Sequence, residues 1–191
     1  MDTPVIIISI IYIIALTASV VPRSTSLEPK TEHALGRRFL VSLVFGLTQG
    51  LMAVLGALLG GLFDHLFFYI APYMVFAMMV IVAVRMLLES MRIVKGKMLF
   101  AFSSSWGFLL LAVISAMNTF LMALFAGTFL PFGRWFNVFV AVAGFLWAMA
   151  TVGVDYSPKV MRRVAFITFS ASVFMLVIAM IVLFGDFNFA G

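Results

Sequence analysis

The chain has 191 residues, of which 65% are hydrophobic and only 10% charged, and its mean hydropathy is +1.24. This composition excludes a soluble globular domain and indicates an integral membrane protein. The sequence has no cysteine, which excludes disulfides and thiolate metal sites. The net charge of +5 comes from basic residues in short gaps between apolar stretches. These residues indicate how the chain is oriented in the membrane, and they do not form a nucleic-acid-binding face.

Six apolar stretches are long enough to cross a bilayer, which takes about 20 residues of helix. The sequence therefore predicts an all-α polytopic membrane protein, with residues 1–191 forming a single membrane domain. In chain order the predicted spans are 4–21, 39–63, 68–91, 106–130, 134–156 and 159–184.

The gaps between these spans alternate in charge. Four lysines and arginines follow the first span, three follow the third and three follow the fifth, whereas the other gaps hold only Arg134. By the positive-inside rule, the three basic loops, including loop 92–105, lie in the cytoplasm and both termini lie on the opposite side of the membrane. The basic residues counted are Arg23, Lys30, Arg37, Arg38, Arg92, Lys95, Lys97, Lys159, Arg162 and Arg163.

Two pairs of similar segments indicate an internal repeat. "LMAVLG" at 51–56 matches "AMATVG" at 148–153, and "VFAMMVIVAV" at 75–84 matches "VFMLVIAMIV" at 173–182, with offsets of 97 and 98. Because each half holds three spans, the second half enters the membrane from the opposite side, which predicts a 3+3 inverted repeat. Many secondary transporters have this architecture, with a site near the midplane; the alternative is a repeat that serves packing alone. The predicted repeats are 4–91 and 106–184.

Small and polar residues follow regular spacings in the second and fourth spans. The second span has a stripe of small residues at spacings of three and four, which predicts close approach of another helix. The fourth span places Ser115, Asn118 and Thr119 on one face. The stripe consists of Gly46, Gly50, Ala53, Ala57 and Gly60.

Three polar side chains within the predicted spans are candidate site residues: Thr17, Gln49 and Asn118. An unpaired amide in hydrocarbon costs a few kcal/mol, so we expect Gln49 and Asn118 to point into the bundle. Two interpretations stay open. Such groups either bond helices together or converge on a functional site.

Arg85 and Glu89 lie one turn apart in the third span. One interpretation is a pair that neutralises itself, with both side chains reaching toward the membrane interface. The other is that Glu89 turns inward as a carboxylate that serves an ion path.

The sequence offers no machinery for an enzyme. Asp64 and His65 are adjacent, so they face different directions on a helix and do not form a metal site. The chain has none of the HExxH, GxSxG, P-loop or paired-carboxylate motifs. We therefore expect no catalytic residues and no cofactor.

Three segments resemble the small bacterial manganese efflux pumps, the MntP-like family within the LysE-type exporter superfamily. They are "FGLTQGLMAVLGALLGG" at 45–61, "VRMLLESMR" at 84–92 and "AMNTFLMA" at 116–123, and the likeness in length and span number covers nearly the whole chain. The resemblance implies a bacterial inner-membrane exporter that moves Mn²⁺ outward through acidic residues within the membrane. Both termini would then lie on the periplasmic or extracellular side.

The chain departs from that family at its acidic positions. Thr17, Gln49 and Asn118 stand where the resemblance implies carboxylates. Mn²⁺ prefers oxygen ligands, and neutral amide oxygens offset less of its dehydration than carboxylates do. We therefore expect an exporter-like protein with an altered, less acidic site lined by Thr17, Gln49, Asn118, Glu89 and Arg85, with Glu89 and Asn118 as the metal ligands if Mn²⁺ remains the substrate.

Two alternatives remain besides this hypothesis. One is a non-transporting accessory subunit, whose surface contacts other membrane-protein subunits as well as the lipid bilayer. The other, suggested by the superfamily alone, is an exporter of an amino acid or similar zwitterion. A transporter would have a cavity between the halves and broken helices near Thr17 and Asn118, whereas an accessory subunit would have Gln49 and Asn118 bonded across a dry seam.

Overall fold

A computed structural model describes residues 3–25, 35–67, 70–96, 105–124, 135–152, 154 and 157–184, and every regular element in these ranges is a helix. This confirms the predicted all-α class. The elements are α1 (Thr3–Thr17), the 3₁₀ turn η1 (Ala18–Val20), α2 (Val21–Thr25), α3 (Leu35–Phe67), α4 (Ala71–Val94), α5 (Ser105–Ala123), α7 (Trp135–Thr151) and α8 (Pro158–Phe184).

Four helical stretches are long and apolar enough to cross a membrane, and two more are apolar but shorter. The shorter ones belong to α5 and α7, which end at Ala123 and Thr151. Both helices end before the predicted boundaries at 130 and 156, and residues 125–134 lie outside the described part. The four longer stretches are Ile6–Thr25, Arg38–Leu62, Tyr73–Val94 and Pro158–Phe184.

The first predicted span is longer than expected and contains a break. Its helical path continues past residue 21 to Thr25, so placing Arg23 in the following loop was wrong. Arg23 is only 4% exposed. Pro22 has no N–H to donate to the carbonyl of Ala18, and that carbonyl instead accepts from Val21. The tighter i→i−3 bond explains why a 3₁₀ turn interrupts the helix here.

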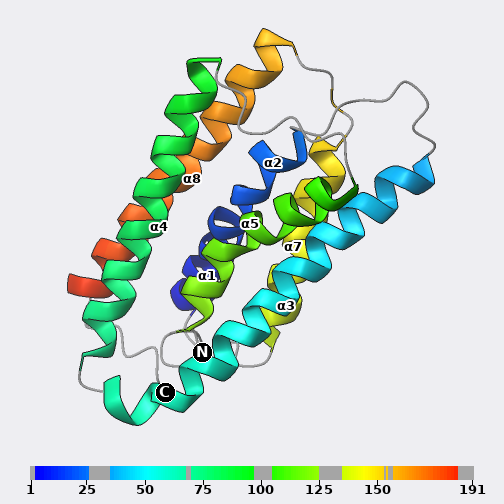
Figure 1. The fold of residues 1–191 in the computed structure, drawn as a ribbon. Helices are drawn as coiled ribbons and strands as arrows, with labels where there is room; N and C mark the ends of the chain where they lie inside the picture. The colour runs from blue at the N-terminus through cyan, green and yellow to red at the C-terminus, as the bar shows by residue number, and fades with distance from the viewer. Residues whose placement is uncertain are drawn as a thin grey trace.

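Corresponding helices of the two halves pack together in antiparallel pairs. The main contacts of α4 are with α8, and α3 packs against α7 and α5. Figure 1 shows α4 and α8 running in opposite directions along one side of the bundle, with α3 and α7 on the other side and the α1–η1–α2 segment between them. The antiparallel direction of these pairs is consistent with the predicted inverted repeat.

The small-residue stripe of α3 is a contact surface for two helices, as the spacing predicts. Gly50 lies against Ala141 of α7, and Gly60 lies against the backbone of Leu124 at the end of α5. A Cβ added at Gly60 would collide with the Leu124 carbonyl oxygen, and only glycine avoids this collision. This close packing fixes α5 and α7 against α3 and so positions the polar face of α5.

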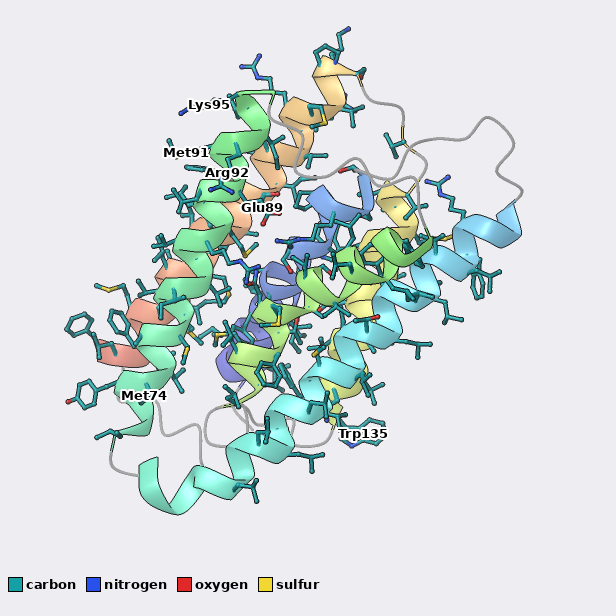
Figure 2. The ribbon with its side chains drawn as sticks, viewed as in Figure 1. Met74, Glu89, Met91, Arg92, Lys95 and Trp135 are labelled. Carbon is teal, nitrogen blue, oxygen red and sulfur yellow. The ribbon has the colours of Figure 1, made fainter. Side chains whose placement is uncertain are left out.

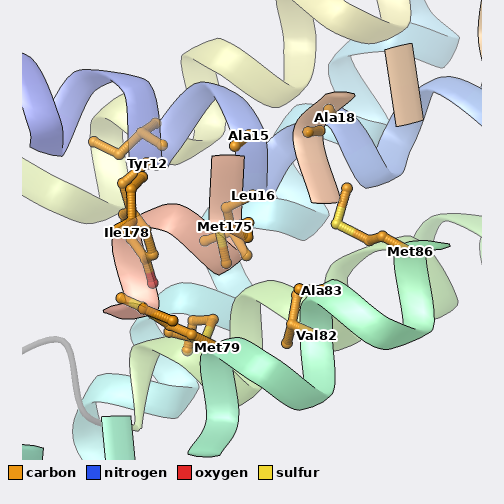
Figure 3. Packing of buried hydrophobic residues seen from close by; sticks show 14 of the residues in the cluster. Tyr12, Ala15, Leu16, Ala18, Met79, Val82, Ala83, Met86, Met175 and Ile178 are labelled. Carbon is orange, nitrogen blue, oxygen red and sulfur yellow. The ribbon is translucent and has the colours of Figure 1, made fainter. Parts of the chain in front are cut away.

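A hydrophobic cluster joins α1, α4 and α8 (Figure 3). Tyr12 and Leu16 from α1, Met79 and Met86 from α4, and Met175 from α8 are all at most 1% exposed. Flexible thioethers fill irregular spaces well, which suits a junction of three helices. The cluster holds α4 beside the broken first helix. This packing brings Arg23 of α2 close to Glu89 of α4.

Candidate functional site

A pocket of about 470 Å³ lies where α4 faces α2 and α5. Its wall combines charged and apolar side chains within segments that are apolar enough to span a membrane. A pocket of this volume is within the range of small-molecule sites. The charged residues that line it are Arg23, Arg85, Glu89 and Arg92, and the apolar ones are Val80, Ile81, Val84, Leu88 and Ile114.

The centre of this charged group is an ion pair between α2 and α4. Arg23 Nη2 lies 3.0 Å from Glu89 Oε2, and the two side chains are 5% and 6% exposed. Arg23 Nη1 also donates to the Ser19 carbonyl oxygen at 2.7 Å. Figure 2 shows Glu89 on the α4 face toward the bundle, with Arg92 one turn nearer the Lys95 end. Glu89 thus turns inward, as the second interpretation of this residue expected.

Arg85 bonds to Asn118 and has no ion pair with Glu89. Its Nη1 donates to Asn118 Oδ1 at 3.1 Å, which links α4 to α5. Arg85 and Glu89 thus do not form a direct ion pair at the interface, because Glu89 is buried and pairs with Arg23 while Arg85 donates to the neutral Asn118 amide. Since the Asn118 oxygen faces a donor, its Nδ2 group points elsewhere and has no hydrogen-bond partner among the described residues.

The charges of the pocket do not balance. Three guanidinium groups and one carboxylate line it, which leaves a formal excess of two positive charges. Glu89 Oε1 is buried and has no hydrogen-bond partner in the described part of the chain. Glu89 Oε1 in the pocket wall and Asn118 Nδ2 next to it in the bundle are therefore two buried polar atoms without hydrogen-bond partners in the described residues. Leaving such atoms unsatisfied is costly.

Gln49 lies in a separate, closed seam between α3 and α5. Its Nε2 donates to Ser115 Oγ at 3.4 Å, and its Oε1 accepts from Thr119. Gln49, Ser115 and Thr119 are all 0% exposed. Both ends of the Gln49 amide are thus satisfied by α5, which is the behaviour of a group that bonds helices together.

Thr17 is buried at the break in the first helix, and its hydroxyl donates to the carbonyl oxygens of Ile13 and Ile14 on its own helix. The structure thus divides the five predicted site residues. Arg85 and Glu89 line the pocket, Asn118 is linked to it through Arg85, and Gln49 and Thr17 are outside its wall.

The surroundings of the two predicted metal ligands, Glu89 and Asn118, suit an anion better than a metal cation, because arginine donors face both of them. Glu89 and Asn118 each turn an oxygen toward an arginine. No group of three or more His, Asp or Glu side chains able to hold a metal ion occurs in the ranges that the structure describes. Asp64 and His65 belong to α3, but their side chains are outside the described part.

The sequence reasoning missed Arg23 and assigned Arg92 to a loop. One signal could have identified Arg23. A carboxylate within a span needs a cation, and the alternation of spans places the end of the first span at the same side of the bundle as Glu89. Arg92 was the last residue of "RMLLESMR", one turn beyond Glu89 on the same helix, and so lay at helical spacing from it.

No protein-family model, no curated protein and no solved structure matches this chain.

Proposed function

We propose that this protein is a solute transporter of the inner membrane, exporter-like in architecture, with its substrate site at the pocket between α2, α4 and α5. The observation that carries the proposal is a pocket of about 470 Å³ lined by four charged side chains within membrane-spanning segments. Charges at this depth are costly and are typical of substrate or ion pathways.

The broken first helix supports the same proposal. Discontinuous helices line the substrate sites of transporters built from inverted repeats, because the interrupted backbone can move and can bind substrate. The 3₁₀ turn Ala18–Val20 lies between Thr17 and Arg23 and ends three residues before Arg23, which lines the pocket. A break at this position would let Arg23 move relative to α1.

Manganese is a poor candidate for the substrate, although the resemblance implies it. Mn²⁺ would enter a pocket with an excess of positive charge, and Glu89 is the one carboxylate in its wall. Repulsion by three arginines is strong where water is scarce. We therefore propose that the exporter architecture is kept with a changed substrate.

The second candidate function is a non-transporting accessory subunit. The closed seam of Gln49, Ser115 and Thr119 favours it, because those polar groups are fully bonded between helices. The pocket is not closed by hydrogen bonds in this way, since Glu89 Oε1 in its wall has no hydrogen-bond partner within the described ranges.

We also propose an orientation. Arg92 and Lys95 end α4, and Arg162 and Arg163 follow the start of α8, at the same end of the bundle. By the positive-inside rule this end faces the cytoplasm, and the pocket lies in the cytoplasmic half. Both chain termini are then on the periplasmic or extracellular side.

Thiol labelling tests the transport function without knowledge of the substrate. Because the chain has no cysteine, a single Ile114→Cys substitution gives a unique thiol in the pocket wall. We expect a membrane-impermeant maleimide to label it in both right-side-out and inside-out vesicles, since a transporter opens its site alternately to the two sides.

Two variants serve as matched controls. Leu146→Cys lies on the exposed face of α7 outside the pocket, and Ala53→Cys is buried in the seam. Neither should react, because one thiol faces lipid and the other is packed. Reaction of Ile114→Cys from one side alone, or from neither side, would contradict transport and favour the accessory subunit.

A further inference from the structure

We propose that the pocket binds an amphipathic organic anion, with a carboxylate or phosphate head among Arg23, Arg85 and Arg92 and an apolar body along α4. This inference rests on the proposed function in treating the pocket as the substrate site. It names the chemical class of the substrate, and it makes Glu89 an internal carboxylate that competes for the same arginine.

The charge of the wall selects the sign of the ligand. Three guanidinium groups face one carboxylate, which leaves a formal charge of three minus one, or two positive charges, to be balanced. Guanidinium groups bind carboxylate and phosphate through paired hydrogen bonds. A ligand with one or two negative charges would neutralise the excess.

Hydrogen-bond donors remain for such a head group. Arg85 has five N–H donors and uses Nη1 for Asn118. Asn118 Oδ1 accepts from Arg85, and Asn118 Nδ2 is a buried donor without a partner in the described residues. An oxygen atom placed near Arg85 would accept from the guanidinium N–H groups that do not bond to Asn118.

The apolar part of the wall indicates the rest of the ligand. Ile81, Val84 and Leu88 lie at spacings of three and four on one face of α4, and they are 53%, 43% and 52% exposed. Their exposed face continues out of the pocket along the surface of the bundle, where lipid would contact it. A head group at Arg85 would therefore extend an attached hydrocarbon chain over these three side chains.

Glu89 occupies the place of an anion when no ligand is bound. Its Oε2 is paired with Arg23 at 3.0 Å, while its Oε1 has no hydrogen-bond partner in the part of the chain that the structure describes. An incoming carboxylate would replace Glu89 at Arg23 or share that guanidinium with it. Removing the negative charge of Glu89 should therefore strengthen anion binding.

Binding is measured with the full chain purified in a nonionic detergent. The probes are decanoate, decyl phosphate and inorganic phosphate, with decyltrimethylammonium as the cationic equivalent, and the readout is isothermal titration calorimetry. We expect decanoate and decyl phosphate to bind, inorganic phosphate to bind more weakly, and the cation not to bind.

Four variants test the assignment. Arg85→Gln and Arg92→Gln should each weaken decanoate binding roughly ten- to a hundredfold, the range for a lost hydrogen bond to a charged group. Glu89→Gln should tighten it by several-fold. Arg162→Gln, an exposed arginine at the same end of the bundle outside the pocket, should leave it unchanged. Arg92 is also exposed, so its variant should fold even if the Arg85 variant does not.

A membrane lipid could supply the same chemistry as a soluble anion. Addition of dioleoylphosphatidylglycerol distinguishes the two sources. If it blocks decanoate binding and decanoate cannot displace it, the head group of a resident lipid is the natural ligand, which still supports an amphipathic anion. If decanoate displaces it, a soluble anion is the ligand.

Two results would overturn the inference. One is equal binding of decanoate and decyltrimethylammonium, and the other is decanoate binding that Arg85→Gln and Arg92→Gln leave unchanged. The thiol experiment remains independent. Labelling of Ile114→Cys from both sides without anion binding would keep transport and reject this substrate class, whereas anion binding with one-sided labelling would keep the anion site and reject transport.

Discussion

The pair of Arg23 and Glu89 is buried on two different helices, and this makes each residue dependent on the other. Removing one member of a buried pair leaves an uncompensated charge, which costs more than the pair itself contributes. Replacing both by apolar residues is often neutral or stabilising. Such a pair is weak evidence for stability, which is one reason for assigning it a role in ligand binding.

We expect Arg23→Met to lower the free energy of unfolding by about 3–5 kcal/mol, because the buried Glu89 side chain loses its ion-pair partner. The double variant Arg23→Met with Glu89→Leu should recover most of this loss. Thermal unfolding of the purified protein in detergent measures both. Equal destabilisation by the single and double variants would mean that the charge pairing is not the cause.

Manganese transport gives a second test at individual residues. Expression of the wild type in a bacterial host sensitised to Mn²⁺ should leave cell manganese unchanged, because three arginines repel a divalent cation. Asn118→Asp together with Gln49→Glu should not restore export while those arginines remain. Manganese content measured by elemental analysis decides this. A wild type that lowers it, and loses this effect on Glu89→Gln, would restore the manganese hypothesis.

Among the helices, the first one is interrupted at Ala18–Val20, and the proposed function assigns this break a role in moving Arg23. Pro22 sets the break, since its ring and missing N–H disfavour a regular helix one turn earlier. An unbroken helix would be more stable but would hold Arg23 rigidly to α1. Pro22 thus lowers the stability of the helix and, under the proposed function, allows Arg23 to move.

Pro22→Ala should raise the free energy of unfolding, by up to about 3 kcal/mol, the cost of proline within a helix. In the Ile114→Cys background it should also restrict maleimide labelling to one side of the membrane. Both quantities can be measured on one preparation. Increased stability with unchanged two-sided labelling would show that the break is not needed for access to the pocket.

The contact of α3 with α5 predicts a contrast between neighbouring glycines. A Cβ at Gly60 would meet the Leu124 carbonyl oxygen, whereas a Cβ at Gly61 meets nothing within 4 Å. Gly60→Ala should cost at least about 1–3 kcal/mol by overpacking. Gly61→Ala should be stabilising by about 0.5–1 kcal/mol, because alanine favours the helix. Similar effects in thermal unfolding would mean that α5 does not lie this close to α3.

For the whole molecule, the described helices show how far the sequence predicts this fold. The helical class and the number of apolar segments follow from length and hydropathy, since a bilayer requires long helices. The burial of Gln49 and Asn118 also follows, because amides avoid hydrocarbon. Their partners do not follow from spacing. One of the two interpretations paired Glu89 with Arg85 on its own helix, but Glu89 binds Arg23, 66 residues away in the chain, because packing decides which charges meet.

Membrane orientation is a prediction at this largest scale. Lys95 and Trp135 are exposed near opposite ends of the bundle (Figure 2). A single thiol from Lys95→Cys should be labelled by an impermeant maleimide in inside-out vesicles, and one from Trp135→Cys in right-side-out vesicles. The reverse pattern would place the termini in the cytoplasm.

The antiparallel pairing of α4 with α8 also bears on directionality. The two helices correspond at an offset of 98 residues, so the position equivalent to Arg85 is Leu183. The backbone is repeated in opposite orientations, but this guanidinium is not. Under the proposed transport function, a solute would therefore meet different chemistry from the two faces of the membrane, so its rates of binding from the two sides would differ while the gradient sets the net direction.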